Sequence, residues 1–302
     1  MRVLITGAGG FVARYLVDEL QAHGHVVSTT DILPSVDLPD YHQADLCDQA
    51  AMRTLVRKAA PNACVHLGAI SFVPDGDRDP SRLLAINIGG TVNLLSAFDQ
   101  ESPGSNFLFV STAQVYGCSP KKCQEPVTTE SPVYPLSMYT ISKCAGEKAA
   151  LAYAMYRNVR AMVVRPGNHT GPGQTPKFLI PSLVSQAKRI RDGEASRFVA
   201  GNLDSERDFT DVRDIVSAYR LILEKGTCGM TYNVSSGNHV PLTSLLAMIQ
   251  SQAGINAQVD VDPSLVRNTD YSRIMDTSEI RDVLGWRPIY SLEQTIHDMI
   301  NE

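Results

Sequence analysis

The sequence lacks any long apolar run. Its 302 residues contain no uninterrupted apolar stretch of about 18 residues, the length that a membrane-spanning helix needs, so we expect no membrane partner. Near the first residue the longest apolar run is Val3-Leu4-Ile5, which is far shorter than the apolar core of a signal peptide. We therefore expect a cytoplasmic protein.

A basic excess is also missing. Lysine and arginine total 27 against 32 aspartates and glutamates, which gives a formal net charge of -5. Proteins that bind nucleic acid usually carry a basic patch or excess, so we expect no nucleic-acid partner. An anionic ligand would have to be held locally, by arginine side chains and by the N-termini of helices.

The cysteines lack the spacing of a metal site. The six stand at positions 47, 64, 118, 123, 144 and 228, with no C-x-x-C pair and no Cys/His cluster. We expect no metal site and scattered, reduced thiols, as is usual in the cytosol. Cys118 and Cys123 fall in one predicted loop, so a redox role there is the alternative.

The composition and pattern that are present indicate a globular α/β protein. The chain is 43% hydrophobic and 20% charged, and in its first half short β-rich runs alternate with helical patterns. This alternation predicts a doubly wound parallel sheet of the Rossmann type with right-handed crossovers. Strands are expected at 2–6, 26–31, 62–67, 106–110 and 159–164, and helices at 10–23, 48–60, 80–100 and 137–157.

The character of the sequence changes after Pro166. Residues 166–181, PGNHTGPGQTPKFLIP, are rich in glycine and proline and predict a loop. We expect a dinucleotide-binding domain at 1–165 and a smaller C-terminal α/β lobe at 166–302 that binds substrate. Segments within 212–240 are candidates to rejoin the first domain. Further helices are expected near 177–191, 212–225, 242–253, 276–285 and 291–300.

A glycine-rich turn after the first strand predicts a dinucleotide site. Gly7, Gly10 and Ala13 open the first helix, where small residues let the backbone approach a pyrophosphate. Asp31 stands 21 residues after Gly10, where a carboxylate accepts hydrogen bonds from the ribose hydroxyls. Its charge would repel the 2′-phosphate of NADP, so NAD(H) is favoured. Arg14 could pair with that phosphate, which keeps NADP(H) as the alternative.

Tyr139 and Lys143 are the predicted chemical centre. Their i, i+4 spacing puts both side chains on one face of a helix. We expect the ammonium to lower the pKa of the phenol from about 10 toward neutrality, so that the phenol can exchange a proton with a sugar hydroxyl. The pair follows a strand that leads into Ser111-Thr112, and ligands bind at the carboxyl ends of such strands.

Several short motifs along the chain accompany this centre. They are TGAGGF at 6–11, DL at 45–46, HLGA at 66–69, NIGGT at 87–91, ST at 111–112 with VYG at 115–117, RP at 165–166, and RDF at 207–209 with Val212 and Asp214. With them, nearly the whole chain resembles the extended short-chain dehydrogenase/reductase family. The resemblance implies that Thr112, Tyr139 and Lys143 form a catalytic triad. It also implies that Asp45 and Leu46 flank the adenine and that Lys143 contacts the nicotinamide ribose.

Together, the motifs and the resemblance give the expected ligand contacts. Those to the cofactor are Gly7, Gly10, Phe11, Val12, Asp31, Ile32, Asp45, Leu46, Leu67, Gly68, Ala69, Asn87, Tyr139, Lys143 and Pro166. Those to the substrate, expected to be a nucleotide sugar, are Thr112, Gln114, Asn168, His169, Arg207 and Arg267.

Two features narrow the expected reaction. Dehydratases of this family carry Asp-Glu directly after the triad threonine, whereas this chain has Ala113-Gln114, neither of which is a general acid. Five later segments resemble those of GDP-4-keto-6-deoxy-D-mannose reductases: NHTGPGQ at 168–174, GNL at 201–203, RDFTDVRD at 207–214, RNTD at 267–270 and LGWRP at 284–288. By this resemblance Asn168 holds the substrate near the cofactor, and Arg207 and Arg267 clamp its diphosphate.

We therefore expect an oxidoreductase that reduces the 4-keto group of a nucleotide-linked 4-keto-6-deoxyhexose. Hydride would come from the nicotinamide and a proton from Tyr139, while Thr112 polarises the ketone. The alternatives are an NAD-dependent nucleotide-sugar 4-epimerase and, more remotely, a non-enzymatic dinucleotide sensor.

Some of these residues also have structural alternatives. Arg207 could form an ion pair with Asp208 or Asp211, and Arg267 could serve a similar structural role. His66 is expected to be a packed residue at the end of a strand. The apolar faces within 83–98 and 141–155 are first of all packing surfaces, although the resemblance implies that they also form a homodimer.

Overall fold

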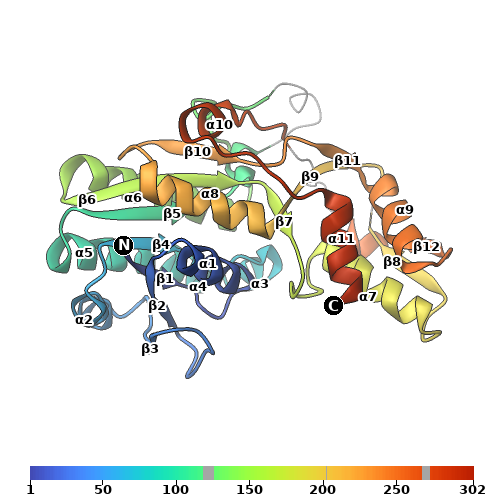
Figure 1. Ribbon diagram of the computed structural model, residues 1–302, viewed down its shortest axis with the longest axis horizontal. Coiled ribbons are helices and arrows are strands. Elements are labelled where there is room, and N and C mark those ends of the chain that lie inside the picture. Colours follow the sequence, from blue (N-terminus) through green and yellow to red (C-terminus); the bar gives the residue numbers. More distant parts are fainter. Residues whose placement is uncertain (118–125, 202, 267–272) are drawn as a thin grey trace.

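The computed structural model describes residues 1–117, 126–201, 203–266 and 273–302. Its centre is a seven-stranded sheet in which all neighbouring strands are parallel, in the order β10-β6-β5-β4-β1-β2-β3 (Figure 1). This is the doubly wound sheet that the sequence predicts. The strands are β1 (Arg2–Thr6), β2 (Val26–Asp31), β3 (Tyr41–Gln43), β4 (Ala63–His66), β5 (Ser105–Val110), β6 (Val159–Pro166) and β10 (Thr231–Val234).

Helices cover both faces of this sheet, and each layer has its own apolar core (Figure 1). Strand β5 is buried between the layers, so its run Phe107-Leu108-Phe109 is apolar without alternation. One layer contains α1 (Phe11–Ala22), α8 (Val212–Lys225) and α10 (Ser278–Leu284). The other contains α2 (Gln49–Ala59), α5 (Thr91–Glu101) and α6 (Met138–Tyr156).

A smaller lobe stands beside the sheet and has a separate core, in which Ile180, Leu245 and Ile296 are fully buried (Figure 1). Its two small sheets have the strand orders β11-β9-β7 and β12-β8. Its strands are β7 (Asn168–Thr170), β8 (Arg197–Ala200), β9 (Glu206–Asp211), β11 (His239–Pro241) and β12 (Gln258–Val261). Its helices are α7 (Leu179–Arg191), α9 (Leu242–Ala253), α11 (Leu292–Asn301) and a short 3-10 turn at Pro263–Leu265.

The structure differs from the sequence prediction in several segments. Strand β3 was not among the predicted strands, and α10, which was expected in the second lobe, packs on the seven-stranded sheet. Within 166–181, predicted to be a loop, Asn168–Thr170 forms β7, because its backbone pairs with that of β9. The helix predicted at 80–100 consists of α4 (Pro80–Leu84), a π-helical turn at Ala85–Gly90, and α5. A short helix that was not predicted, α3 (Val73–Arg78), precedes α4. In addition, α8 packs on the seven-stranded sheet and β10 extends it beside β6.

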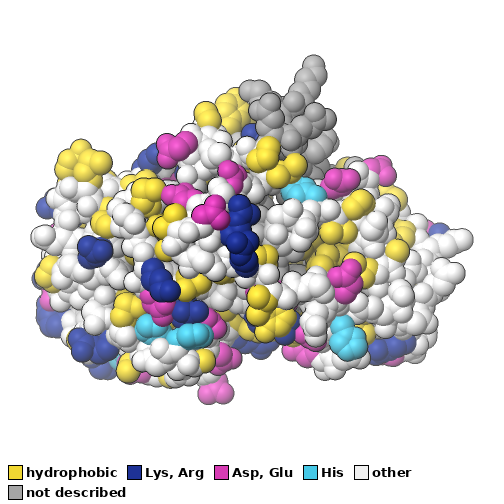
Figure 2. Space-filling view, turned by 45° about the horizontal axis from the view of Figure 1, so that its top comes forward, with side chains coloured by type: hydrophobic (Ala, Val, Ile, Leu, Met, Phe, Trp, Pro, Cys, Tyr) yellow, Lys and Arg dark blue, Asp and Glu magenta, His cyan; other side chains and the backbone are white. Residues whose placement is uncertain are grey.

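The surface is mixed in charge, with acidic and basic side chains interspersed over the face that Figure 2 presents. Within the described ranges, no helix combines the length and apolar character that a membrane crossing requires. Nor does that part of the chain gather three or more His, Cys, Asp or Glu side chains into a metal-binding group. Cys47, Cys64, Cys144 and Cys228 are free thiols, whereas Cys118 and Cys123, for which a redox role was the alternative, lie outside the described residues.

Candidate functional site

A cavity of about 680 Å³ runs along the carboxyl ends of the strands and is bordered by the second lobe. It gathers residues from both halves of the chain, as ligand sites in such sheets do. All but one of the predicted cofactor contacts line it: Gly7, Gly10, Phe11, Val12, Asp31, Ile32, Asp45, Leu46, Leu67, Gly68, Ala69, Tyr139, Lys143 and Pro166.

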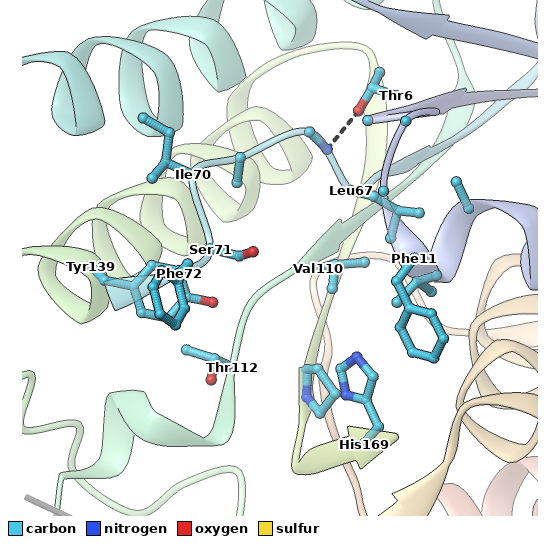
Figure 3. Close-up of a pocket in the computed structure, with 18 of the residues that line it drawn as sticks. Thr6, Phe11, Leu67, Ile70, Ser71, Phe72, Val110, Thr112, Tyr139 and His169 are labelled. Atoms are coloured by element: carbon cyan, nitrogen blue, oxygen red, sulfur yellow. Dashed lines mark hydrogen bonds between the residues drawn. The ribbon is translucent and has the colours of Figure 1, made fainter. Parts of the chain in front are cut away.

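The turn between β1 and α1 requires glycine at its first position. Gly7 has a φ of +75°, and a Cβ there would lie 2.8 Å from the backbone nitrogen of Gly68. The hydroxyl of Thr6 accepts a hydrogen bond from that same nitrogen at 3.1 Å, which ties the β1 and β4 turns together (Figure 3). At the other end of the turn, α1 begins directly after Gly10 and presents its N-terminal amides. The turn therefore fits the pyrophosphate of a dinucleotide.

Asp31, predicted to bind the ribose, lines the cavity at the end of β2. Its two carboxylate oxygens accept hydrogen bonds from the backbone nitrogens of Gly9, at 2.9 Å, and Leu33, at 3.2 Å. Arg14, the residue that could have paired with a 2′-phosphate, is engaged elsewhere. Its guanidinium donates to the Pro172 carbonyl at 3.0 Å and lies 3.9 Å from the Glu302 carboxylate. The carboxylate at this end therefore fits a ribose with free hydroxyl groups better than one that carries a phosphate.

Asn87 is the predicted cofactor contact that does not line the cavity. It lies in the π-helical turn, where only 2% of its surface is exposed. Its amide donates to the Ile70 carbonyl at 3.1 Å and to the Ser142 hydroxyl at 2.9 Å, while its carbonyl accepts from the Ile70 nitrogen at 2.8 Å. Asn87 thus joins the loop after β4 to α6 and supports the cavity wall from behind.

The triad residues come together where α6 begins. A capping box starts this helix: the Ser137 hydroxyl accepts from the Thr140 nitrogen, and the Thr140 hydroxyl accepts from the Ser137 nitrogen. Tyr139 therefore lies in the first turn, where it faces the cavity beside Thr112 (Figure 3). Lys143 lies one turn further along, and its ammonium donates a hydrogen bond to the Val110 carbonyl at 2.8 Å.

Burial decides the proton affinities of this pair, and it overturns our expectation for Tyr139. Removal from water raises the pKa of Tyr139 to about 12, and a hydrogen bond with Thr112 only partly opposes this rise. The prediction that the ammonium lowers the phenol's pKa was therefore wrong, since Lys143 donates to the backbone instead. Burial lowers the pKa of Lys143 to about 8, against the attraction of Glu147. At neutral pH the site therefore holds a protonated phenol.

His66 is a packed residue, as the sequence indicates. One ring nitrogen is 2.7 Å from the Thr6 hydroxyl and the other is 3.0 Å from the Thr91 hydroxyl. The ring is 1% exposed, and burial lowers its pKa from 6.5 to about 3. His66 therefore stays neutral and supports the ends of β1 and β4.

The state of His66 predicts a loss of stability in acid. Below pH 6.5 the unfolded chain protonates this ring, whereas the folded protein does so only near pH 3. The free energy of unfolding should therefore fall as the pH drops through this window, by up to about 1.4 kcal/mol per pH unit from this group. Urea unfolding of wild type and His66→Gln at several pH values measures the slope. The exposed His23→Gln is the control and should keep the wild-type slope. If the free energy of unfolding falls equally steeply with pH in wild type and His66→Gln, the effect belongs to other groups.

A second cavity, of about 810 Å³, adjoins the first. The two cavities share Thr112, Gln114, Pro166, Gly167 and Asn168, so the triad threonine faces both. Arg207 lines the second cavity, His169 lines the first, and Arg267 lies outside the described residues.

The second-lobe residues around this junction are held by local hydrogen bonds. The Asn168 amide donates to the Asp208 carbonyl at 3.4 Å, and a ring nitrogen of His169 donates to the Gly167 carbonyl at 3.0 Å. Burial lowers the pKa of His169. Asp211 pairs with Arg213 at 2.7 Å, so it is already neutralised by an arginine other than Arg207.

Arg273 is a cavity residue that the sequence analysis missed. It lines the second cavity together with Arg207. Two of its guanidinium nitrogens, Nε and Nη1, are buried and have no hydrogen-bond partner within the described ranges. Buried guanidinium nitrogens need a hydrogen-bond acceptor. An anionic ligand in this cavity could accept hydrogen bonds from these two nitrogens. The only signal in the sequence was its place six residues after Arg267.

Comparison with known proteins agrees with this geometry. The family model for GDP-mannose 4,6 dehydratase matches residues 4–299. The chain is 33% identical to GDP-6-deoxy-D-mannose reductase of Pseudomonas aeruginosa, over 100% of this chain and 96% of that protein. A structure of RMD from Pseudomonas aeruginosa complexed with NADPH superposes with a TM-score of 0.89, at 31% identity, covering 99% of this chain and 97% of the other. UDP-glucose 4-epimerase of Thermus thermophilus in complex with NAD gives a TM-score of 0.87, at 27% identity, covering 100% and 98%.

Proposed function

The chain belongs to the GDP-mannose 4,6-dehydratase family, within the extended short-chain dehydrogenases/reductases, and from this premise we propose that it is a nucleotide-sugar 4-ketoreductase. The family is one of enzymes that use NAD or NADP. The proposed reaction is reduction of the 4-keto group of a nucleotide-linked 4-keto-6-deoxyhexose of the GDP-4-keto-6-deoxymannose type. The similarity to GDP-6-deoxy-D-mannose reductase supports this substrate class.

The position of the Tyr139 phenol beside Thr112 at the cavity carries the proposal (Figure 3). Reduction of a ketone leaves an oxyanion that must receive a proton, and a phenol that is protonated at neutral pH can donate it. Thr112, which faces both cavities, is placed to hydrogen-bond the same oxygen. Positions 113 and 114 carry Ala and Gln, so the acid and base that dehydration needs are absent from these positions.

In this proposal the first domain holds the cofactor. The Gly7–Gly10 turn and the N-terminus of α1 receive the pyrophosphate, Asp31 the adenosine ribose, and Asp45 and Leu46 the adenine, while Lys143 orients the nicotinamide ribose. When bound, the reduced nicotinamide supplies the hydride that adds to the ketone carbon. The engaged Arg14 and the carboxylate of Asp31 support NAD(H) over NADP(H).

The second lobe holds the substrate in this proposal. Gln114, Asn168 and His169 lie near the junction of the two cavities and are assigned to the sugar. Arg207, together with Arg267 by resemblance, is assigned to the diphosphate. Arg273, which lines the second cavity, joins them, because two of its nitrogens have no partner among the described residues and are suited to phosphate oxygens.

Arg273 gives a measurable prediction about substrate binding. Arg273→Ala should raise the KM for the sugar nucleotide by about tenfold to a hundredfold, the usual worth of hydrogen bonds to a charged group. The kcat should stay within about threefold, because the phosphates lie away from the reacting carbon. Initial rates and calorimetric titration with GDP measure both effects. Arg281→Ala, which removes a partly exposed arginine paired with Asp282, is the control. A KM unchanged from wild type would remove Arg273 from the substrate site.

The reaction itself is tested with a panel of GDP- and dTDP-linked 4-keto-6-deoxyhexoses. Purified protein is mixed with NADH or NADPH, and oxidation of the cofactor is followed by absorbance. NMR of the product then gives the configuration at C4. Oxidation with at least one ketone, and faster with NADH, is the expected result. No oxidation with any member of the panel would refute the proposal.

A 4-epimerase is the second candidate, because epimerases of similar structure bind NAD and Asp31 suits that cofactor. An epimerase keeps its cofactor through the cycle. Protein that is purified with stoichiometric NAD and interconverts UDP-hexoses without added NADH would favour this alternative over the reductase.

We also propose a homodimer formed through α5 and α6. Val92 and Ile141 on these helices are exposed apolar side chains, which supports a second copy as their cover. Sedimentation velocity should give twice the mass of one chain, and a monomer at micromolar concentration would contradict the proposal.

A further inference from the structure

A buried ion pair lies behind the catalytic residues, outside both cavities. The side chains of Glu147 on α6 and Arg165 on β6 are only 1% and 5% exposed. The guanidinium donates twice, from Nε to Oε1 at 2.9 Å and from Nη2 to Oε2 at 2.7 Å. Burying two charges costs free energy that their attraction often only just repays, so stability alone is a weak reason for such a pair.

The position of Glu147 suggests another reason. Tyr139, Lys143 and Glu147 are spaced four residues apart, so they form one row along α6. This row meets the residues at the end of β5: the Lys143 ammonium donates to the Val110 carbonyl at 2.8 Å, and the Ser111 hydroxyl donates to Glu147 at 2.5 Å.

The next residue after Ser111 extends the pattern, because Thr112 lies beside the Tyr139 phenol (Figure 3). Three successive turns of the helix therefore face three successive residues of the strand end. This attachment fixes the distance between the catalytic helix and Thr112.

Arg165 extends the same network toward the substrate cavity. It donates to the Tyr116 hydroxyl at 2.9 Å and to the Thr129 carbonyl at 3.2 Å. Tyr116 in turn donates to Asn233 at 2.7 Å, and Asn233 donates to the carbonyls of Val127 and Asp276 at 3.1 and 3.3 Å. Asp276 directly follows Met275, which lines the second cavity.

Glu147 is also the carboxylate whose negative charge favours the cationic form of Lys143. The other groups facing this ammonium are Tyr139 on the same helix, His66 from β4 and the aromatic ring of Phe109 from β5, whose centre is 5.2 Å away. The first two are neutral at physiological pH because burial raises the pKa of the phenol and lowers that of the imidazole. Arg165 from β6 is positive and is matched by Glu147 itself.

We propose that Glu147 is a positioning residue: held by Arg165, it fixes α6 against the end of β5 and supplies the negative charge that keeps Lys143 cationic. The part of this inference that concerns turnover rests on the proposed ketone reduction. The part that concerns the charge of Lys143 does not.

The charge of Lys143 can be measured without any substrate. Protein labelled with ¹³C-lysine is titrated by NMR, and the Lys143 signal is assigned from its absence in Lys143→Met. Wild type should titrate near pH 8. Loss of the neighbouring negative charge favours the neutral amine, so Glu147→Gln should titrate about one unit lower or more. Glu147→Asp keeps the charge and should restore most of the difference. Unchanged titration in Glu147→Gln would overturn the proposal.

Turnover gives the second measurement. In Glu147→Gln the alkaline limb of the kcat/KM profile should move to lower pH, in the same direction as the Lys143 titration. At pH 8 the kcat should fall by about tenfold, while the KM for the sugar nucleotide stays within about threefold. Ser111→Ala removes one attachment and no charge, so it should lower kcat without moving the limb. A fall in kcat with an unmoved limb in Glu147→Gln would overturn the proposed effect of Glu147 on the charge of Lys143.

Two controls separate the inference from other failures. Glu130→Gln removes an exposed carboxylate and should match wild type in both measurements. If Glu147→Gln does not fold, because Arg165 is left buried and unpaired, the double variant Glu147→Leu/Arg165→Met removes both charges and often preserves such a site. Because Arg165 is removed with Glu147, the downward shift of Lys143 should be smaller than in Glu147→Gln but in the same direction. If wild type reduces no ketone while Lys143 still shifts in the variant, only the proposed function fails.

Discussion

Tyr139→Phe is expected to lower the kcat for ketone reduction by about two to four orders of magnitude, the usual contribution of a general acid. The variant keeps the ring that packs at the start of α6 and loses only the hydroxyl that would protonate the oxyanion. Because the lost interaction concerns the transition state, kcat and kcat/KM should fall together. Stopped-flow measurement of a single turnover with saturating NADH gives the rate of the chemical step.

The structure offers a matched control for this variant on the same helix. Tyr156 is 77% exposed at the end of α6, so Tyr156→Phe removes a phenol hydroxyl far from the cavity and should retain wild-type kcat. Binding of NADH, measured by fluorescence, should change by less than about threefold in Tyr139→Phe if the cofactor site is intact. A kcat within tenfold of wild type would remove Tyr139 from its proposed role as proton donor.

Asp31→Asn is expected to change the choice of cofactor. The ratio of kcat/KM with NADH to that with NADPH should fall on the order of a hundredfold, because juxtaposed like charges cost several kcal/mol. The substitution keeps the size of the side chain and one oxygen able to accept the bond from the Gly9 nitrogen. Loss of a charge-assisted bond to the ribose should lower activity with NADH, while loss of repulsion raises activity with NADPH.

A variant of Arg14 distinguishes NAD(H) from NADP(H) as the cofactor. If Arg14 paired with a 2′-phosphate, Arg14→Ala would impair NADPH alone. Its hydrogen bond to Pro172 and its proximity to Glu302 indicate an interlobe contact instead, so the cofactor ratio should stay within about threefold of wild type. A selective loss of NADPH activity in Arg14→Ala would favour NADP(H) as the cofactor.

Features that depend on neighbours in the chain were predictable. The spacing of Gly7 and Gly10 after an apolar strand predicts the turn, and the four-residue spacing of Tyr139 and Lys143 predicts a shared helix face. Alternating strands and helices likewise predict the parallel sheet, because crossover connections have one preferred hand. These inferences rest on local geometry, which the order of residues already contains.

Features that depend on burial or on distant partners were not predictable. The pKa of Tyr139 follows from how completely other elements exclude water from it, and this reversed the expected direction of its shift. Arg14 contacts Pro172, which is 158 residues away in the sequence, and Glu302 at the other end of the chain. Asn87 carries a family motif, yet its contacts with Ile70 and Ser142 place it behind the cavity wall.

By itself, then, the sequence determined that this protein has a doubly wound sheet with a dinucleotide turn and a Tyr-x-x-x-Lys helix beside a strand that ends in Ser-Thr. The tertiary structure alone decided that the phenol stays protonated, that Lys143 lies against the Val110 carbonyl, and that Arg273 reaches the second cavity. The physical reason is that residue spacing sets which side chains share a face. Burial and the meeting of distant segments set their charge states and their partners.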